Sequence, residues 1–275
     1  MNDSLRLQCP AKLNLFLHIT GRRDDGYHCL QTIFQIIDLC DTLTIDTTES
    51  TDLSFHCDEP SLNDDDNLVL RAAQALRKAT GTNLGARMHL EKHIPTGAGL
   101  GGGSSNAASA LLGLNRLWHT QLSTAQLAQI GVSLGADVPL FVYGHSAWAE
   151  GIGEILTPME LPEKHFLVIN PGCHVSTQEI FSHQQLTRNT TAIKMAAFLA
   201  RHTRNDCENV VKSLYPAVDK ALIWLNQFAQ ARMTGTGASI FATFDSAEEA
   251  QTLLRQVPQG MRGFVAKGLN SSPAC

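Results

Sequence analysis

The sequence predicts an α+β fold, in which strands and helices follow one another without regular alternation. Near the start, over residues 13–19, apolar residues recur at every second position, which is the period of a strand. Elsewhere they recur at spacings of three and four, the period of an amphipathic helix, as at Ala107, Leu111, Leu114 and Trp118. The second half of the chain mixes short strand-like and polar helical segments, which favours α+β layers over a parallel βαβ array.

The first ninety residues have mostly strand patterns, interrupted by one helical pattern. Alternation marks residues 13–19, 53–57 and 84–90, and an apolar helical face marks residues 67–79. The sequence Ser-Thr-Ala-Gln at 123–126 is a capping box, so a helix is expected through Leu134, with Gly135 ending it. The remaining elements are expected as strands at 166–169, 240–244 and 263–267, and as helices within 176–230 and at 246–256.

The length of 275 residues is large for one domain and comfortable for two, and 43% hydrophobic residues are enough for two cores. A proline-rich, acidic stretch at 157–163 separates two parts of different texture. We therefore expect an N-terminal domain of residues 1–157 and a C-terminal domain of residues 158–275.

Composition excludes several classes of partner. Charged residues make up 17% of the chain and the net charge is −5, without the basic stripe of a nucleic-acid-binding protein. No apolar run reaches the roughly 18–20 residues that span a bilayer. The first residues also lack the basic and apolar regions of a signal peptide. The sequence therefore predicts a cytoplasmic protein that binds neither nucleic acid nor membrane. A monomer or weak homodimer is expected, although nothing in the composition indicates the oligomeric state.

Cysteines and histidines are scattered without the spacing of metal ligands. The seven cysteines are an odd number with no Cys-x-x-Cys pair, and the eleven histidines are dispersed. Reduced thiols that fill the core, and no metal held by the protein, are expected. The cysteines are Cys9, Cys29, Cys40, Cys57, Cys173, Cys207 and Cys275.

The most informative stretch is residues 95–106, Pro-Thr-Gly-Ala-Gly-Leu-Gly-Gly-Gly-Ser-Ser-Asn, which runs into the helical pattern that follows. Glycines let the backbone approach a ligand closely and adopt positive φ. The start of a helix presents unpaired N–H groups and the positive end of its dipole, which suit an anion. The segment therefore predicts a phosphate-binding loop.

Better-known glycine loops do not fit this segment. Residues 97–102 satisfy the dinucleotide pattern Gly-x-Gly-x-x-Gly, but the acidic residue expected about 20 positions on, after a second strand, is replaced by a helical region. No Gly-Lys-Ser/Thr ends the loop, as a P-loop requires, and no protein-kinase signatures occur. A flexible linker is the remaining alternative. Its position between a strand and a patterned helix favours phosphate binding.

Two other polar positions are candidates for chemistry. Lys12 and Asn14 lie two apart on one face of the first strand, opposite Leu13 and its apolar neighbours. A solvated strand face is the simpler interpretation of that pair. Asp137 stands between Gly135 and a proline, and a turn or cap aspartate is its simpler interpretation.

The three motifs at 10–15, 95–106 and 235–241 together resemble those of the galactokinase, homoserine kinase, mevalonate kinase and phosphomevalonate kinase superfamily (the GHMP kinases). They occur in the same order and spacing. The stretches at 25–28, 134–139 and 268–273 are similar to those of superfamily members that act on cytidine-diphosphate-linked methylerythritol. The resemblance covers residues 6–273.

The resemblance implies a two-domain GHMP-kinase-like fold, with a ribosomal protein S5-like N-terminal domain and a ferredoxin-like α/β sandwich as C-terminal domain. The active site would lie in the cleft between the domains. The implied activity is transfer of phosphate from ATP to the 2-hydroxyl of the cytidine-diphosphate-linked methylerythritol. Mg²⁺ would be bound mainly through ATP.

The resemblance also assigns roles to residues. Asp137 would accept the hydroxyl proton, and Lys12 would steady the reacting oxygens and stabilise negative charge. Tyr27 and Phe181 would stack on the cytosine ring, and His28 would contact its polar edge. The implied ATP-binding residues are Asn67, Lys92, Pro95, Gly97, Ala98, Gly99, Leu100, Gly101, Gly102, Gly103, Ser104, Ser105 and Asn106. The implied substrate-binding residues are Asn14, Tyr27, His28, Thr177, Phe181, Gly235, Thr236 and Gly237.

Two alternatives stay open at this point. One is a kinase of the same superfamily that acts on another small alcohol, such as homoserine or mevalonate; such relatives lack the Tyr27-His28 pair. The other is a non-catalytic ligand sensor on the same fold, against which the presence of both Lys12 and Asp137 argues.

Overall fold

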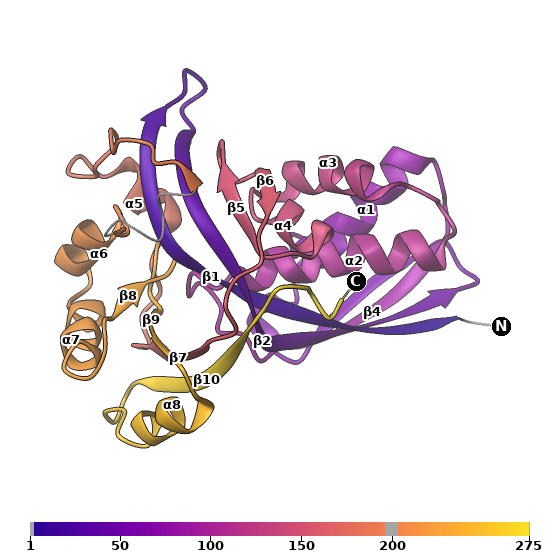
Figure 1. Ribbon diagram of the computed structural model, residues 1–275. Helices are drawn as coiled ribbons and strands as arrows, with labels where there is room; N and C mark the ends of the chain where they lie inside the picture. Colours follow the sequence, from indigo (N-terminus) through magenta and orange to yellow (C-terminus); the bar gives the residue numbers. More distant parts are fainter. Residues whose placement is uncertain (1–2, 196–202, 275) are drawn as a thin grey trace.

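Two long antiparallel strands run through the centre of the molecule (Figure 1). The computed structural model describes residues 3–195 and 203–274. β1 (Ser4–Arg22) pairs with β2 (His28–Thr48) from end to end of both strands, with register shifts that mark bulges. One such shift follows Pro10, which has no N–H to give to the ladder. Both strands are buried on both faces in their middle parts. The interpretation of Lys12 and Asn14 as residues of a solvated strand face is therefore wrong, because both side chains are buried.

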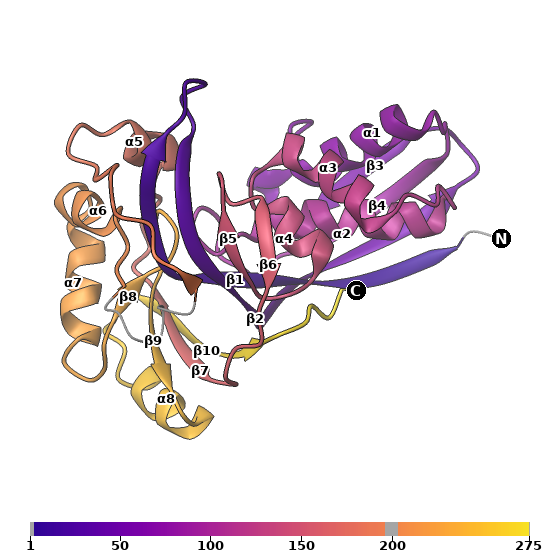
Figure 2. The ribbon, with the colours of Figure 1, turned by 45° about the horizontal axis from the view of Figure 1, so that its top comes forward.

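The N-terminal helices cover one side of the first part of the sheet (Figures 1 and 2). The elements of this half are β3 (Leu53–Cys57), η1 (Pro60–Leu62), α1 (Leu68–Thr80), β4 (Gly85–Glu91), α2 (Gly102–Leu117), α3 (Thr124–Leu134), α4 (Val138–Tyr143), β5 (Ala147–Glu150) and β6 (Ile155–Pro158). Strand β4 pairs with β2, and β3 lies parallel to β4 at the sheet edge. Helix α2 buries a row of small and apolar residues, among them Ala107, Leu111 and Leu114, against this sheet.

The C-terminal half adds strands to the same sheet. Its elements are β7 (His165–Asn170), α5 (Thr177–Ser182), α6 (Glu208–Leu214), α7 (Pro216–Leu225), β8 (Arg232–Met233), β9 (Ile240–Phe244), α8 (Ala247–Leu254) and β10 (Arg262–Leu269). Strand β10 pairs with β7, and its last residues, Gly268 and Leu269, pair with β2. The order β3-β4-β2-β10-β7-β9-β8 therefore joins the two halves through β10.

Three of the four hydrophobic clusters among the described residues follow this arrangement. One lies under the N-terminal helices, and a second lies in the C-terminal half but includes Leu17 and Ile19 of β1. The third lies at the junction and packs residues of the glycine segment, such as Ala98 and Leu100, on Phe166 of β7. Because β1 contributes to all three clusters, it connects them; the predicted domain boundary at 157/158 stays a prediction.

The expected elements are present, with a few differences. The capping box at Ser123 and Gln126 is formed and Gly135 caps α3, as predicted. Helix α2 begins at Gly102, five residues before the apolar stripe at Ala107, because the glycines and serines of the loop already form its first turn. The predicted linker at 157–163 is wrong in its first residues, which lie in β6 and pair with β5. Part of the predicted helical region, residues 196–202, lies outside the described residues.

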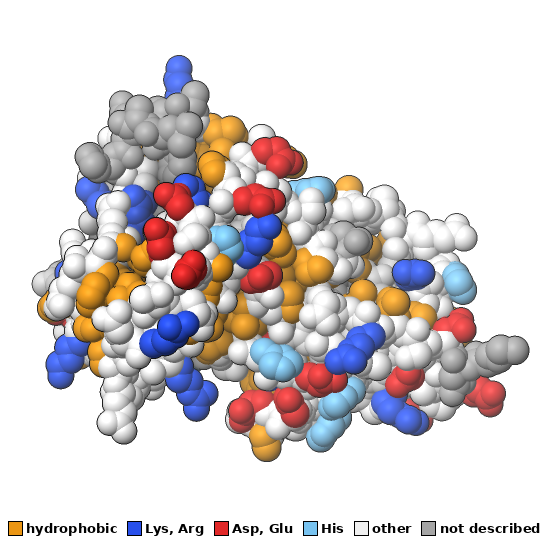
Figure 3. Space-filling model, turned by 60° about the horizontal axis from the view of Figure 1, so that its bottom comes forward, with side chains coloured by type: hydrophobic (Ala, Val, Ile, Leu, Met, Phe, Trp, Pro, Cys, Tyr) orange, Lys and Arg blue, Asp and Glu red, His pale blue; other side chains and the backbone are white. Residues whose placement is uncertain are grey.

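The surface and the thiols agree with the composition. On the face in Figure 3, acidic and basic side chains are interspersed. None of the described helices has both the length and the apolar character that crossing a bilayer requires. The six cysteines of the described chain are free thiols, and Cys275 lies outside it. Burial raises the pKa of Cys9 to about 11 and that of Cys207 to about 12, so these thiols are poor nucleophiles at neutral pH.

Truncation of a fully buried leucine should measure how much the N-terminal core contributes. Leu111 in α2 is 0% exposed, and Leu111→Ala should lower the free energy of unfolding by about 2–5 kcal/mol through the cavity it leaves. Leu214→Ala, at a position 38% exposed, is the matched control and should have a much smaller effect. Urea unfolding followed by circular dichroism compares the two; equal losses would contradict the assignment of this core.

Candidate active site

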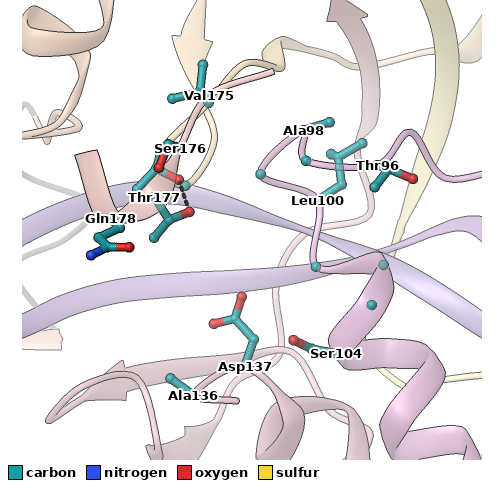
Figure 4. Close-up of a pocket in the computed structure, with 18 of the residues that line it drawn as sticks. Thr96, Ala98, Leu100, Ser104, Ala136, Asp137, Val175, Ser176, Thr177 and Gln178 are labelled. Atoms are coloured by element: carbon teal, nitrogen blue, oxygen red, sulfur yellow. Dashed lines mark hydrogen bonds between the residues drawn. The ribbon is translucent and has the colours of Figure 1, made fainter. Parts of the chain in front are cut away.

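A cleft of about 1200 Å³ lies where the glycine segment, the β1–β2 hairpin and α5 meet. This is larger than the usual pocket for one small ligand, roughly 300–1,000 Å³, and has room for two substrates. All the predicted site residues except Ser105 line it. Figure 4 shows the Asp137 carboxylate pointing into the space between the glycine segment, at Ala98 and Leu100, and the turn at Ser176, Thr177 and Gln178. The predicted site residues, other than Ser105, therefore lie around a single cleft.

The glycine segment is held by alternating small and apolar positions. Ala98 and Leu100 are buried in the junction core, while the glycines between and beside them have positive φ. The φ of Ala98 is not positive, so its methyl group is accommodated in the core without backbone strain. Backbone hydrogen bonds from Lys12 N to Leu100 O (2.9 Å) and from Ser239 N to Ala98 O (3.2 Å) tie the segment to β1 and to a second glycine turn at residues 234–239.

Gly99 is a position of the glycine segment where a side chain would meet backbone atoms. Its φ is +75°, and a Cβ atom there would lie 2.4 Å from the carbonyl oxygen of Thr234. The two glycine turns therefore lie backbone against backbone at this point, and the Thr234 hydroxyl donates to Gly99 O (3.3 Å). The Thr234 hydroxyl also accepts a hydrogen bond from Asn14 N (2.9 Å), which brings β1 into the same contact.

Lys12 and Asp137 face each other across the middle of the cleft. Lys12 Nζ lies 3.4 Å from Asp137 Oδ2, and it donates hydrogen bonds to Asn14 Oδ1 (2.6 Å) and to Gly99 O (3.0 Å). The lysine is buried, whereas the Asp137 side chain is 31% exposed to the cleft. Asn14 is itself fixed by donating to the Thr32 hydroxyl (2.9 Å). The cation is therefore held rigidly, beside a carboxylate that a substrate can reach.

A residue that the sequence did not single out supports this region. Asp41 in β2 is 0% exposed, and its carboxylate accepts hydrogen bonds from Lys92 Nζ, Asn106 Nδ2 (2.9 Å) and the backbone N–H groups of His93 (2.7 Å) and Ile94 (2.8 Å). It thus connects the three residues that follow β4 to α2. Nothing in its sequence neighbourhood indicated this role, because the four donors lie 51–65 residues away.

Three predicted ATP-binding residues differ in how their side chains are placed relative to the cleft. Asn67 is the N-cap of α1, where its side chain accepts from Val69 N (2.9 Å) while still lining the cleft. Lys92 pairs with Asp41 and also lines the cleft. Ser105 is 0% exposed, lies outside the lining of the cleft, and its hydroxyl has no partner among the described residues. The backbone N–H of Ser105, in the first turns of α2, donates to Gly101 O (2.9 Å).

The substrate side contains the predicted aromatic residues. His28 and Phe181 are stacked, with ring centroids 5.2 Å apart and an interplanar angle of 28°. Tyr27 is 60% exposed at the tip of the β1–β2 hairpin. The hydroxyls of Thr177 and Thr236 lie 2.9 Å apart, which joins α5 to the second glycine turn. Phe181 also packs against the C-terminal core, so one side chain contributes both to that core and to the lining of the cleft.

Two cleft residues that sequence reasoning missed are His174 and Arg22. A Cβ atom on Gly97 would lie 2.1 Å from His174 Nδ1, so the imidazole lies directly over the glycine segment. Arg22 ends β1 opposite His28. Neither lies in a motif, and only their position in the folded chain brings them into the cleft.

The comparisons with known proteins agree on one family. The GHMP kinases N terminal domain profile matches residues 67–145, and the GHMP kinases C terminal profile matches residues 185–263. A protein of Shewanella loihica named 4-diphosphocytidyl-2-C-methyl-D-erythritol kinase is 50% identical over 273 residues, which cover 99% of this chain and 96% of the relative. The chain belongs to the 4-diphosphocytidyl-2-C-methyl-D-erythritol kinase family.

Solved structures agree with this family. A crystal structure of 4-(cytidine 5'-diphospho)-2C-methyl-D-erythritol kinase matches with a TM-score of 0.83 at 30% identity, covering 96% of this chain and 99% of that one. Mevalonate kinase of Methanococcus jannaschii matches with a TM-score of 0.70 at 17% identity, covering 98% and 99%, and shares the fold alone. The two-domain GHMP-kinase fold expected from the sequence is therefore confirmed, and the chain is a small-molecule kinase.

Replacing Asp41 should destabilise the protein strongly. Asp41→Asn keeps the size of the side chain but leaves Lys92 as a buried charge without its partner, so we expect a loss of about 3–5 kcal/mol in the free energy of unfolding. The matched control is Asp245→Asn, whose carboxylate pairs with Lys164 at the surface and is 83% exposed. Guanidinium unfolding should show an unchanged midpoint for the control; a similar midpoint for Asp41→Asn would refute this role.

Proposed function

We propose that this kinase transfers the γ-phosphoryl group of ATP to the 2-hydroxyl of 4-diphosphocytidyl-2-C-methyl-D-erythritol, giving the 2-phosphate and ADP, in the non-mevalonate isoprenoid pathway. The observation that carries the proposal is the Lys12–Asp137 pair, with Nζ and Oδ2 3.4 Å apart, between the glycine segment and the stacked His28 and Phe181. This arrangement provides a base and a cation between a phosphate site and an aromatic pocket. The name of the relatives agrees with it.

In this mechanism Asp137 accepts the proton of the attacking hydroxyl. Its carboxylate is open to the cleft, where an alcohol can approach within hydrogen-bond distance. Lys12 stabilises the negative charge that develops on the oxygens around the transferred phosphorus. Its ammonium needs no reorganisation for this, because Asn14 Oδ1 and Gly99 O already hold it.

The ATP phosphates would lie over the first turn of α2, where Gly102, Gly103 and Ser104 present free backbone N–H groups. The described residues contain no cluster of His, Cys, Asp or Glu that would hold a resident metal ion. The oxygen atoms of Ser104 and Asp137 in the cleft suit a hard cation that enters with ATP, so the residues fit Mg²⁺. Mg²⁺ bound there with ATP would neutralise part of the negative charge of the phosphates.

The acceptor pocket would take the cytosine ring between Tyr27 and Phe181. Both aromatic residues line the same cleft as Asp137 and the glycine segment, and so do Thr177 and Thr236, whose hydroxyls lie 2.9 Å apart. Stacking between a base and an aromatic side chain contributes about 1–3 kcal/mol. A kinase for homoserine or mevalonate would have no use for this pocket.

A direct assay tests the reaction. The purified protein is incubated with ATP, Mg²⁺ and 4-diphosphocytidyl-2-C-methyl-D-erythritol, and the product is identified by mass spectrometry and phosphorus NMR. A phosphate at the 2-position is expected. Turnover of homoserine or mevalonate, with no product from the cytidine compound, would replace this proposal by the second candidate. The cytoplasmic location and the monomer or weak homodimer stay predictions, the second of which light scattering tests.

Loss of the proposed base should reduce turnover without preventing binding. Asp137→Asn should lower kcat by about 10²–10⁴-fold, because the proton acceptor is removed. The KM for ATP should change by less than about threefold if the phosphates bind through the glycine segment and α2. Asp219→Asn, in a surface pair with Lys212, is the control and should leave kcat unchanged. Undiminished turnover by Asp137→Asn would disprove the mechanism.

Loss of the exposed aromatic residue should affect only the acceptor. Tyr27→Ala should raise the KM for the cytidine substrate by about tenfold, the equivalent of one stacking contact, with the KM for ATP unchanged. Tyr143→Ala, at another exposed tyrosine outside the cleft, is the control. An equal rise in the KM for ATP would contradict the assignment of Tyr27 to the cytidine substrate.

A further inference from the structure

Arg188 lies behind the proposed cytosine pocket, although no sequence motif includes it. Its guanidinium donates hydrogen bonds to the carbonyl oxygens of Phe181 (3.0 Å), His183 (2.8 Å) and Leu186 (3.2 Å). Its Nε donates to Nε2 of His28, at 3.0 Å. One half-buried side chain thus connects the end of α5 to the first residue of β2, which are the two walls of the pocket.

The hydrogen bond to His28 has a chemical consequence. A guanidinium has only donors, so the imidazole nitrogen that it contacts must accept and cannot carry a proton. A neutral imidazole carries its single proton on the other nitrogen. With Nε2 as the acceptor, His28 is therefore the tautomer with a proton on Nδ1.

The surroundings of His28 keep the ring neutral. Burial, followed by the positive charges of Arg188 and Arg22, lowers the pKa of His28 below its ordinary value of 6.5. These charges come from both sides: Arg22 from β1, which pairs with His28 in the sheet, and Arg188 from the segment after α5. The third neighbour, Phe181, stacks on the ring and carries no charge. No acidic group among these neighbours offsets the two cations.

We propose that Arg188 is a positioning residue that fixes His28 as the Nδ1–H tautomer, so that the pocket presents a hydrogen-bond donor to a pyrimidine base. This rests on the proposed function, because it takes the base to lie between Tyr27 and Phe181. The polar edge of cytosine carries acceptors at N3 and O2, whereas N3 of uracil carries a hydrogen. A ring nitrogen that can only donate selects the former, since a donor facing a donor leaves both unpaired.

Arg188 also fixes the partner ring. Its bond to the Phe181 carbonyl oxygen and its bond to His28 come from the same planar group, which holds the two rings at their 5.2 Å stacking distance. The planar, rigid fork of arginine is suited to such a task, and the ammonium of lysine is not. A lysine in Arg188→Lys should therefore replace only part of the hydrogen bonding of the guanidinium.

NMR spectroscopy of the ligand-free protein tests the tautomer independently of any substrate. With ¹⁵N-labelled histidine, the two ring nitrogens of His28 are assigned by comparison with His28→Gln. The wild-type protein at neutral pH should show a protonated Nδ1 and an unprotonated Nε2. Arg188→Met, which keeps the side-chain length but cannot donate, should shift His28 toward the Nε2–H tautomer. An Nε2–H tautomer in the wild-type protein, or no change in Arg188→Met, would overturn the proposal.

Steady-state kinetics test the consequence for specificity. Arg188→Met should raise the KM for the cytidine substrate about tenfold with kcat and the KM for ATP little changed, and it should reduce the preference over the uridine analogue by a similar factor. Arg188→Lys should restore part of the preference. Arg255→Met, an exposed arginine at the end of α8, is the matched control. A loss of kcat with an unchanged preference would assign Arg188 a purely structural role and refute the proposal.

The two experiments separate the possible failures. If the cytidine compound is not a substrate, the proposed function fails, while the NMR result still decides whether Arg188 sets the tautomer. If the compound is a substrate but His28 is unaffected in Arg188→Met, this inference alone fails. A melting temperature for each variant shows whether the fold is intact.

Discussion

The structure depends on the pairing of β1 with β2. This ladder is buried on both faces in its middle part, and its residues enter all four hydrophobic clusters of the described chain. The same strands carry Lys12 and Asn14 at the centre of the cleft and His28 at its far end. A main-chain ladder fixes distances along a strand more closely than loops do, so the reacting groups and the base pocket are held at a set separation.

Buried polar groups complete what the ladder begins. Asp41 accepts hydrogen bonds from the residues that follow β4 and from Asn106 of α2, and Asn14 holds Lys12 in place. Such groups are costly to bury unless every partner is present, so they stabilise only one arrangement of the surrounding elements. The proposed phosphate site therefore depends on two features: glycines that permit close approach, and carboxylate and amide groups that fix where the glycine segment begins and where α2 starts.

Sequence reasoning succeeded where the signal was local. The capping box of α3, the helix over α1 and the strands β3, β7 and β9 follow from period and caps, which act over a few residues. The glycine segment was identified because its composition is unusual and its rivals lack specific residues. Strand β2 was not delimited, because burial on both faces removes the alternation that marks a strand. Asp41 and Arg188 were missed for another reason: each is a single charged residue whose partners come from distant segments, and only folding reveals them.

The connection of the two halves through β10 and the long ladder limits how the molecule can move. A kinase that closes around its substrates by swinging two bodies about a flexible joint needs a place where few contacts cross. Here the sheet runs from one half into the other without a gap, and Leu17 and Ile19 of β1 belong to the far core. Rotation of one half against the other would have to break strand pairing. The segments that border the cleft at the hairpin tip and just before α5 lie outside this paired sheet, so they are the parts of the cleft that strand pairing does not hold.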